Sequence, residues 1–461
     1  MKIVVIGDGK IGYSLTQALS REGHDLMVID NQKKTLTQTE EMLDVMVLEG
    51  NGASSSVQKM AGVDSADLMI AVTNADEINL LCCVVARKLG CKHTIARIRN
   101  PEYAEELYLL RDELGLSMTV NPERSAAKEI FGLLQYPSFL KRDSFAKGRA
   151  EIVELPVRED GKLCGMVLAE LYRALKVRVL VCAVERAGTV HIPDGRFMLQ
   201  AGDHIYVTAA TPDLMSMVKS IGLETPRIHS VMIVGGSRIA YYLTQMLLSA
   251  GIKVKLIETQ RERCDELCAL LPKADVVHAD GSSFQALLSE GIEETDAVVT
   301  LTNFDEQNII ISMYANSLHV PKVVSKINRP EYASILPTNA AECIISPRLL
   351  TSNDIVRYVR AMQNRQGAGV IALHHLVEDK VEALEFHASA GTWYLGVPLK
   401  DVPLKADLLL ALISKRGRII VPSGGDSIAA EDTVVIVTTA ERNFSDLNDV
   451  FSKPPQGGAD A

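Results

Sequence analysis

An internal repeat is the feature that most constrains how this sequence can fold. Three segments of the first half return in the second half at one common shift of 229 residues. They are 73–79 (TNADEIN), which returns as 302–308 (TNFDEQN); 98–104 (IRNPEYA), which returns as 327–333 (INRPEYA); and 193–195 (PDG), which returns as 422–424 (PSG). One shift shared by separate regions indicates duplication of a whole unit, so the architecture is built twice.

The composition indicates a globular protein and argues against several classes of partner. Hydrophobic residues make up 47% of the 461 residues and charged residues 23%, as in globular domains. The net charge of -10 disfavours binding to nucleic acid or anionic lipid, because both need basic patches. No run reaches the roughly 20 apolar residues of a spanning helix, and the first ten residues do not resemble a secretion signal. We therefore expect a cytoplasmic protein that is at most peripheral to a membrane.

The first part of each copy alternates short apolar segments with segments of helical periodicity. In the first copy the predicted strands are Lys2–Ile6, Asp25–Ile29, Val45–Leu48, Leu68–Val72, His93–Ile98 and Ser117–Val120. The predicted helices are Ile11–Arg21, Ser54–Ala61, Ile78–Leu89, Pro101–Leu114 and Pro122–Gln135. Strands that alternate with helices favour a mostly parallel, doubly wound sheet. We therefore predict an α/β fold with a Rossmann-like domain in each copy.

The second part of each copy is rich in strands and turns. In the first copy the predicted strands are Glu151–Val157, Arg178–Val184, Thr189–Ile192 and His204–Thr208. A small β-rich α+β domain is expected to follow each Rossmann-like domain. The predicted boundaries are 1–145 and 228–365 for the Rossmann-like domains, and 146–227 and 366–461 for the β-rich domains, the last of which ends in a frayed tail.

The first copy carries a glycine-rich nucleotide-binding pattern directly after its first strand. The pattern G-x-G-x-x-G is formed by Gly7, Asp8, Gly9, Lys10, Ile11 and Gly12. Gly7 allows a tight turn, Gly9 lets the backbone approach a phosphate, and Gly12 permits close packing of helix on strand. The helix that follows offers free amides and a favourable dipole to phosphate groups.

Asp30 and three residues at other strand ends complete the predicted crevice. Asp30 ends the second strand, where a carboxylate can accept the ribose hydroxyls and repel the 2′-phosphate of NADP. Asn51 and Gly52 follow the third strand, and Thr73 follows the fourth. These residues are assigned to the crevice only by their position after the strands. The alternative for Asp30 is a turn residue that binds no ligand. These residues favour an adenine nucleotide with an unmodified ribose, and leave NAD(H), ADP and ATP open.

Two arginines lie at the end of the predicted fifth strand. Arg97 and Arg99 are two residues apart, so both side chains are expected to leave the same face of the strand. Guanidinium groups at this edge suit a polyphosphate, because each can donate paired hydrogen bonds. The alternative is an exposed pair that forms surface salt bridges.

The second copy has diverged at the matching positions. Its loop is Gly235, Gly236, Ser237, Arg238, Ile239 and Ala240, and its other matching residues are Glu258, Asp280, Gly281, Lys326 and Asn328. Alanine is accepted at the last loop position, whereas Ser237 puts a side chain where the backbone should approach phosphate. Lys326 and Asn328 replace two arginines and lower the positive charge. We predict two unequal sites, and leave open whether the second binds a nucleotide.

At these residues the sequence resembles the tandem RCK (KTN) family of TrkA-type subunits, the peripheral subunits of Trk potassium transporters. The resemblance covers nearly the whole chain and rests on residues 7–12, Asp30, 51–52, 73–79 and 96–99, with a β-rich domain after each half. It implies a ring, a homotetramer, on the inner face of the cell membrane, with the helix at about 122–135 helping to form the dimer. It also implies that NAD(H), ADP or ATP changes the ring and so gates a potassium-translocating subunit of TrkH/TrkG type.

Two other functions are weighed against this one. An NAD-dependent oxidoreductase needs a general acid or base beside the nicotinamide, whereas the histidines of the β-rich parts are isolated in the sequence. The eight cysteines contain no Cys-x-x-Cys pair, so no metal site is predicted. We therefore predict that the protein is not an enzyme. The second alternative is an RCK-type regulator of another ion channel or exchanger.

Overall fold

Each copy contributes one segment to each of two structural units. The first unit comprises Met1–Phe131 and Ile228–Val356, and the second comprises Gly132–Arg227 and Arg357–Ala461. The computed structural model describes residues 1–103, 111, 113–145, 149–223, 226–329, 332, 343–363, 370–377, 380–439, 444 and 446–454. Within these ranges no helix has both the length and the apolar character that crossing a bilayer requires.

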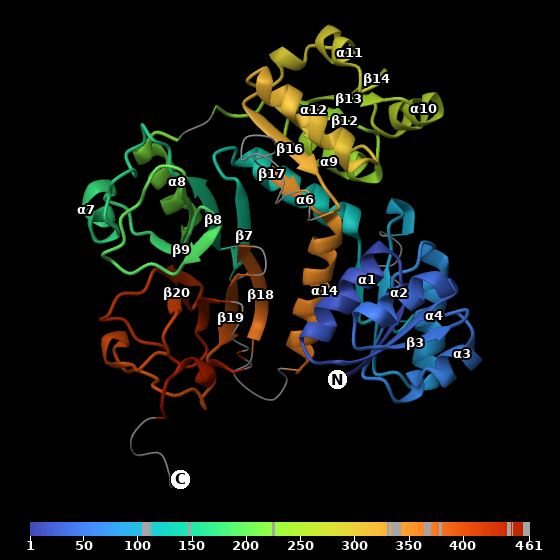
Figure 1. The fold of residues 1–461 in the computed structure, drawn as a ribbon, viewed down its shortest axis with the longest axis horizontal. Coiled ribbons are helices and arrows are strands. Elements are labelled where there is room, and N and C mark those ends of the chain that lie inside the picture. The colour runs from blue at the N-terminus through green and yellow to red at the C-terminus, as the bar shows by residue number, and fades with distance from the viewer. Residues whose placement is uncertain are drawn as a thin grey trace. The chain divides into compact units, whose positions relative to one another are not determined.

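A six-stranded parallel sheet forms the centre of the first copy's Rossmann-like domain (Figure 1). Its strands are β1 (Lys2–Ile6), β2 (Asp25–Asp30), β3 (Met46–Glu49), β4 (Leu68–Ala71), β5 (His93–Arg97) and β6 (Met118–Val120), in the order β3-β2-β1-β4-β5-β6. Its helices are α1 (Lys10–Arg21), α2 (Lys33–Met42), α3 (Ser55–Met60), η1 (Val63–Ser65), α4 (Asp76–Leu89) and α6 (Pro122–Gln135). The strand order reverses between β1 and β4, which is where such sheets bind ligands at their carboxyl edge.

The second copy repeats this sheet with the same strand order. Its strands are β12 (Ser230–Val234), β13 (Lys253–Glu258), β14 (Asp275–His278), β15 (Ala297–Thr300), β16 (Lys322–Lys326) and β17 (Cys343–Ile345), in the order β14-β13-β12-β15-β16-β17. Its helices are α9 (Arg238–Ser249), α10 (Arg261–Leu270), α11 (Phe284–Ser289), η3 (Ile292–Glu294), α12 (Asp305–Ser317) and α14 (Pro347–Gln363). All four residues of β4 and of β15 are buried, as expected for parallel strands covered on both faces.

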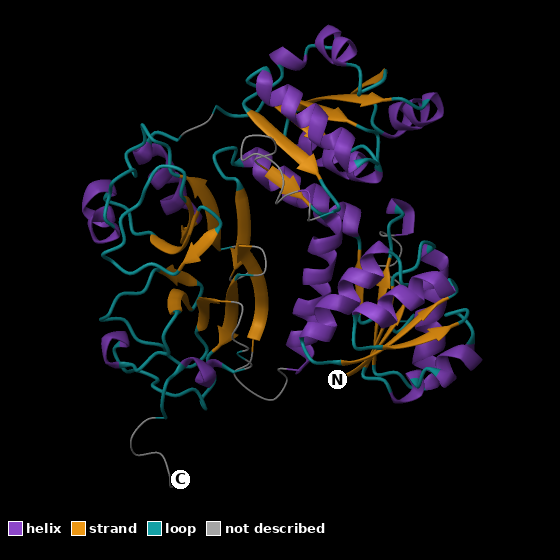
Figure 2. Cartoon of the chain, viewed as in Figure 1, coloured by secondary structure: helices purple, strands orange, loops and turns teal. Residues whose placement is uncertain are grey.

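Two five-stranded antiparallel sheets form the β-rich parts, and their strands are joined mostly by loops (Figure 2). The first contains β7 (Lys141–Phe145), β8 (Ala150–Pro156), β9 (Leu180–Arg186), β10 (Thr189–His191) and β11 (His204–Ala210), with η2 (Leu168–Glu170), α7 (Leu171–Leu175) and α8 (Thr211–Ile221). The second contains β18 (Val370–Val377), β19 (Val381–His387), β20 (Leu408–Lys415), β21 (Arg418–Ile420) and β22 (Thr433–Thr439), with η5 (Leu399–Asp401) and η6 (Leu447–Val450). The two sheets share one apolar cluster within the second unit, to which both copies contribute.

The predicted fold class is confirmed by two parallel and two antiparallel sheets. Every strand predicted for the first copy has an observed counterpart, with ends that differ by at most a few residues. The predicted strand His93–Ile98 ends earlier, at Arg97. Most of the helix predicted at 101–114 lies outside the described residues, as does the tail beyond residue 454.

Among the described residues of the first copy, four α-helices or strands were missed from the sequence: α2, β7, α7 and α8. Only Leu36 and Thr39 of α2 are buried, so its apolar periodicity is weak. α8 buries four apolar residues, and the β-rich pattern around it obscured that signal. β7 pairs with β8 in the antiparallel sheet, on the Rossmann-like side of the boundary predicted after residue 145. The domain boundaries stay predictions.

Candidate functional site

The glycine-rich loop of the first copy joins β1 to α1, and packing explains two of its glycines. Gly7 has a φ of 99°, and a Cβ there would lie 2.9 Å from the backbone nitrogen of Thr73. A Cβ on Gly12 would lie 1.8 Å from the carbonyl oxygen of Gly7. At Gly9, in contrast, no atom of the described residues lies within 4 Å of an added Cβ. Gly9 therefore borders open space, where a phosphate could approach the backbone.

The start of α1 offers amides to that space. Gly9 is the N-cap residue and has no side chain, so the first amides of the helix have no side-chain cap. Lys10 follows with an exposed side chain and Ile11 with a half-buried one. Free amides at a helix N-terminus, together with the helix dipole, form a site that suits an anion.

Asp30 holds the glycine-rich loop in place. Its Oδ2 accepts a hydrogen bond from the amide of Asp8 at 2.6 Å, and its Oδ1 accepts one from the amide of Gln32 at 2.8 Å. Asp30 thus has a structural role, because one of these bonds joins β2 to the glycine-rich loop, and contact with a ligand through Asp30 stays a prediction. Each carboxylate oxygen keeps a further lone pair that can accept a ribose hydroxyl.

Asp8 points away from the crevice into the protein. Its Oδ2 accepts a hydrogen bond from the hydroxyl of Thr39 in α2 at 2.6 Å. Its Oδ1 is buried and has no hydrogen-bond partner among the described residues. Burial raises the pKa of Asp8 to about 6; the Thr39 hydroxyl opposes this rise, and the charge of Asp30 adds to it.

The loops after β3 and β4 lie at the same carboxyl edge of the parallel sheet. Asn51 Oδ1 accepts the amide of Ala53 at 3.0 Å, so Asn51 caps the turn before α3. Gly52 packs against β1, since a Cβ there would lie 2.2 Å from Cγ2 of Ile6. These two residues shape the loop, and contact with a ligand through them stays a prediction.

Asn79 of α4 joins the ends of β4 and β5. Its Oδ1 accepts hydrogen bonds from the amide of Thr73 at 2.8 Å and from the Thr73 hydroxyl at 2.7 Å. Its Nδ2 donates to the carbonyl oxygen of Arg97 at 2.9 Å. The Thr73 side chain is therefore committed to the loop, and its position beside Gly7 places it at the predicted crevice.

The two arginines at the end of β5 have different partners. Arg99 lies beyond the end of β5, with its Nε 3.4 Å from Oδ1 of Asp76. Oδ2 of Asp76 accepts the amides of Arg99 at 2.7 Å and of Asn100 at 2.8 Å. Arg99 is thus tied to the start of α4 and lies beyond the strand, so its role in binding phosphate together with Arg97 stays a prediction.

Arg97 is the arginine that remains at the carboxyl edge of the sheet. It is 8% exposed, and its guanidinium lies 3.7 Å from Oε1 of Glu123 in α6. Burial lowers the pKa of Arg97; Glu123 opposes this effect, and the charges of Arg99 and, to a smaller extent, Arg238 of the second copy add to it. Burial also lowers the pKa of Lys326, to which Lys10 contributes. Basic groups of both copies therefore lie within electrostatic reach of Glu123 in the first unit.

The second copy keeps the same loop frame. Gly235 has a φ of 103°, and the amide of Gly236 donates to Oε2 of Glu258 at 2.7 Å. Oε1 of Glu258 accepts the amide of Gln260 at 2.8 Å. Glu258 therefore holds this loop as Asp30 holds the first one.

The second loop differs where a phosphate would be received. Ser237 is the N-cap of α9, and its hydroxyl accepts the amide of Ala240 at 3.4 Å. Arg238 begins the helix and Ile239 is buried. Nε of Arg263 donates to the carbonyl oxygen of Gly236 at 2.7 Å. Ser237 thus occupies an amide that the glycine of the first loop leaves available.

The strand ends of the second copy repeat the frame of the first. Asp280 accepts hydrogen bonds from the amide and hydroxyl of Ser282, which lower its pKa. Asn308 accepts the amide of Thr302 at 2.9 Å and donates to the carbonyl oxygen of Lys326 at 2.9 Å. The same side-chain bridge therefore joins neighbouring strands in both copies.

Sequence reasoning missed three residues that shape the first site: Asp76, Asn79 and Glu123. Asp76 and Asn79 belong to the repeated segment 73–79 and return as Asp305 and Asn308, so the repeat itself signals their structural role. Glu123 gives no such signal, because its proximity to Arg97 arises only when α6 packs on the sheet edge.

Comparison with known proteins decides the family. Residues 3–122 and 231–347 match the TrkA-N domain, and residues 152–222 and 384–445 match the TrkA-C domain. The chain belongs to the TrkA family. The resemblance inferred from the sequence is thereby confirmed, including the tandem order of the domains.

Relatives of the TrkA family match over almost the full length of this chain. The chain is 31% identical over 436 residues to the "Trk system potassium uptake protein TrkA homolog" of Archaeoglobus fulgidus, covering 95% of this chain and 97% of the relative. It is 29% identical over 457 residues to the "Trk system potassium uptake protein TrkA homolog 2" of Methanosarcina mazei, covering 97% and 100%. The fold is shared with the "GsuK channel bound to NAD", with a TM-score of 0.61 and 18% identity over 95% of this chain and 77% of that one.

Proposed function

We propose that this TrkA-family chain is a nucleotide-binding regulatory subunit of a potassium-uptake system. The observation that carries the proposal is the first crevice, in which Asp30 holds the glycine-rich loop and Gly9 borders open space at the start of α1. Relatives named as potassium uptake proteins match over nearly the whole chain, which supports the same role here.

The ligand is an adenine nucleotide, NAD(H) or ATP/ADP. Asp30 suits an unmodified ribose and the N-terminus of α1 suits phosphate groups. Arg97 keeps a donor for a terminal phosphate, because its Nε is buried and has no hydrogen-bond partner among the described residues. Arg97→Ala should therefore weaken ATP binding more than NADH binding, and equal losses would contradict that assignment.

The partner is a membrane potassium-translocating subunit of TrkH/TrkG type, and the protein acts as a homotetrameric ring on the inner face of the membrane. The nucleotide acts by shifting a population between two ring shapes, without catalysis. A tenfold difference in affinity for the two shapes provides about 1.4 kcal/mol. The nucleotide is bound by the site residues predicted in both copies, and the four domains have the boundaries predicted from the sequence.

The first test is equilibrium binding of ATP, ADP, NADH and NADPH to the full-length protein. Asp30→Ala should weaken ATP and NADH binding, whereas Asp25→Ala, at the exposed amino end of the same strand, should leave it unchanged. NADPH should bind more weakly than NADH, because Asp30 repels a 2′-phosphate. Absence of Asp30-dependent binding, or turnover of NADH, would contradict the regulatory role.

A further inference from the structure

Helix α9 of the second copy reaches the first copy through the side chain of Tyr242. α9 begins at Arg238, directly after the second glycine-rich loop, and Tyr242 lies about one turn farther along. The Tyr242 hydroxyl donates a hydrogen bond to the carbonyl oxygen of Arg99 at 3.1 Å and accepts one from Nδ2 of Asn121 at 3.0 Å. Tyr242 is 6% exposed, and its two partners Arg99 and Asn121 are half-buried.

The two groups that Tyr242 contacts belong to the frame of the first site. The amide of Arg99 is held by the carboxylate of Asp76 at 2.7 Å, and Asp76 begins α4 at the carboxyl edge of the sheet. Asn121 caps α6, since its Oδ1 accepts the amide of Arg124 at 2.8 Å. A displacement of α9 therefore acts on the loop after β5 and on the start of α6, and both border the first crevice.

The residues that would form the reciprocal contact are short. Ser14 of α1 occupies the position of Tyr242, and Ser346 occupies the position of Asn121. The Ser346 hydroxyl accepts the amide of Leu349 in its own helix at 3.5 Å. A serine side chain lacks the reach of a tyrosine, so this contact runs from the second copy to the first.

We propose that Tyr242 is a positioning residue that couples the two nucleotide sites, so that occupancy of the second loop changes the affinity of the first site. The inference rests on the proposed function. A phosphate at the N-terminus of α9 interacts with the helix dipole, and helix shifts of about 1–2 Å are a common means of transmitting binding. A groove of about 550 Å³ lies between α9 and α6.

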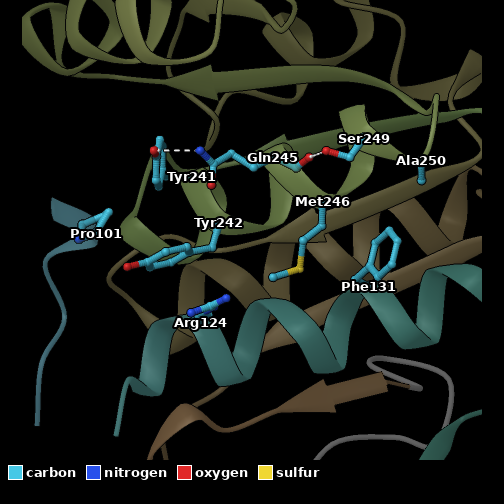
Figure 3. Close-up of a pocket in the computed structure, with 9 residues that line it drawn as sticks. All are labelled: Pro101, Arg124, Phe131, Tyr241, Tyr242, Gln245, Met246, Ser249 and Ala250. Atoms are coloured by element: carbon cyan, nitrogen blue, oxygen red, sulfur yellow. Dashed lines mark hydrogen bonds between the residues drawn. The ribbon is translucent and has the colours of Figure 1, made fainter. Parts of the chain in front are cut away.

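Figure 3 shows the two adjacent tyrosines of α9 in different settings, which provides a matched control. Tyr242 lies toward Arg124 of α6, whereas Tyr241 accepts a hydrogen bond from Nε2 of Gln245 at 2.8 Å within α9. Tyr241→Phe removes the same hydroxyl group one residue away from Tyr242→Phe. Only Tyr242→Phe removes the hydrogen bonds to Arg99 and Asn121 of the first copy.

The test is calorimetric binding of NADH to the full-length protein. First-site affinity is measured with the second loop intact and with Glu258→Ala, in wild type, Tyr242→Phe and Tyr241→Phe. Glu258→Ala should change that affinity by about 5-fold or more in wild type and Tyr241→Phe, the lower end of typical coupling between sites, and by less than about 2-fold in Tyr242→Phe. Ser237→Phe, which blocks the second loop and leaves Glu258 in place, repeats the comparison independently.

The outcomes separate this inference from the proposed function. An equal change in wild type and Tyr242→Phe would overturn the coupling and leave nucleotide binding intact, as would no effect of either second-loop variant in wild type. Absence of any Asp30-dependent binding of NADH would remove the proposed function, and the coupling with it. A purely structural role for Tyr242 would alter stability without changing the coupling factor.

Discussion

Asp8 is the buried acid of the first glycine-rich loop, and its replacement by asparagine should change stability in a pH-dependent way. Asp8 is 1% exposed; the Thr39 hydroxyl donates to one of its oxygens, and the other has no hydrogen-bond partner among the described residues. Burial raises its pKa from 3.8 to about 6. The folded state therefore bears the cost of a buried negative charge whenever the pH is well above 6.

The sign of the effect follows from proton linkage. The folded state binds the Asp8 proton more tightly than the unfolded chain, so its stability rises as the pH falls through about 6 and levels off below the unfolded value of 3.8. At about 1.4 kcal/mol per pKa unit, the difference between 3.8 and about 6 corresponds to about 3 kcal/mol. This contribution is lost progressively as the pH rises and is absent above about pH 7.

Asp8→Asn keeps the shape of the side chain and removes the charge. We expect the first parallel sheet of the variant to be more stable than wild type by about 1–3 kcal/mol at pH 8, and the difference to vanish toward pH 4. The lower value allows for the weaker hydrogen bond from Thr39 to a neutral amide.

The assay is urea unfolding followed by hydrogen exchange in peptides from β1 and β2, which reports this sheet rather than the whole multidomain chain. Asp25→Asn, at the exposed start of β2, is the control and should follow wild type. If Asp8→Asn is no more stable than wild type at pH 8 and keeps the same pH slope, the reasoning is refuted.

Four further predictions concern the same loops. Gly9→Ala should fold as stably as wild type but bind NADH about 10-fold more weakly in calorimetry, whereas Gly12→Ala should lose about 1–3 kcal/mol of unfolding free energy in urea. Asp76→Ala should cost about 1–3 kcal/mol by the same assay, because two backbone amides lose their acceptor. Ser237→Gly should tighten nucleotide binding at the second loop and cost only about 0.3 kcal/mol of helix capping. Lowering the pH from about 8 to about 6 should tighten NADH binding in wild type but not in Asp8→Asn, because a charged Asp8 repels phosphate.

The parallel sheets were predictable because two local signals agree. Short apolar strands alternate with helical segments, and the glycine pattern falls between the first strand and the first helix. Glycine is required at Gly7 and Gly12, because a Cβ at either position would clash with nearby backbone atoms. The repeat doubled each signal. α2 lacked such a signal, because its single buried apolar residue gives no helical stripe.

The side-chain partners in the site could not be predicted from spacing. Arg99 is paired with Asp76, which accepts hydrogen bonds from both its amide and its side chain, a contact between residues 23 positions apart. The sequence placed Asp8 in the glycine-rich loop. In the structure its side chain is buried, and the hydroxyl of Thr39 in α2, a helix that was not predicted, donates a hydrogen bond to it. Both outcomes depend on how helices pack over the sheet edge, which sequence periodicity does not specify.

The two copies together distinguish residues that build the fold from residues that select a ligand. Asp30 and Glu258 each accept a hydrogen bond from an amide of their glycine-rich loop. An acid at this strand end therefore stabilises the loop whether or not a nucleotide binds. Gly9 has no such reason, because its missing side chain would meet open space. The replacement of this glycine by Ser237, which caps its own helix, therefore bears more directly on ligand binding than the retained acid does. On this argument we expect the first site to make the larger contact with phosphate, and the second copy to keep the frame with a weaker phosphate site.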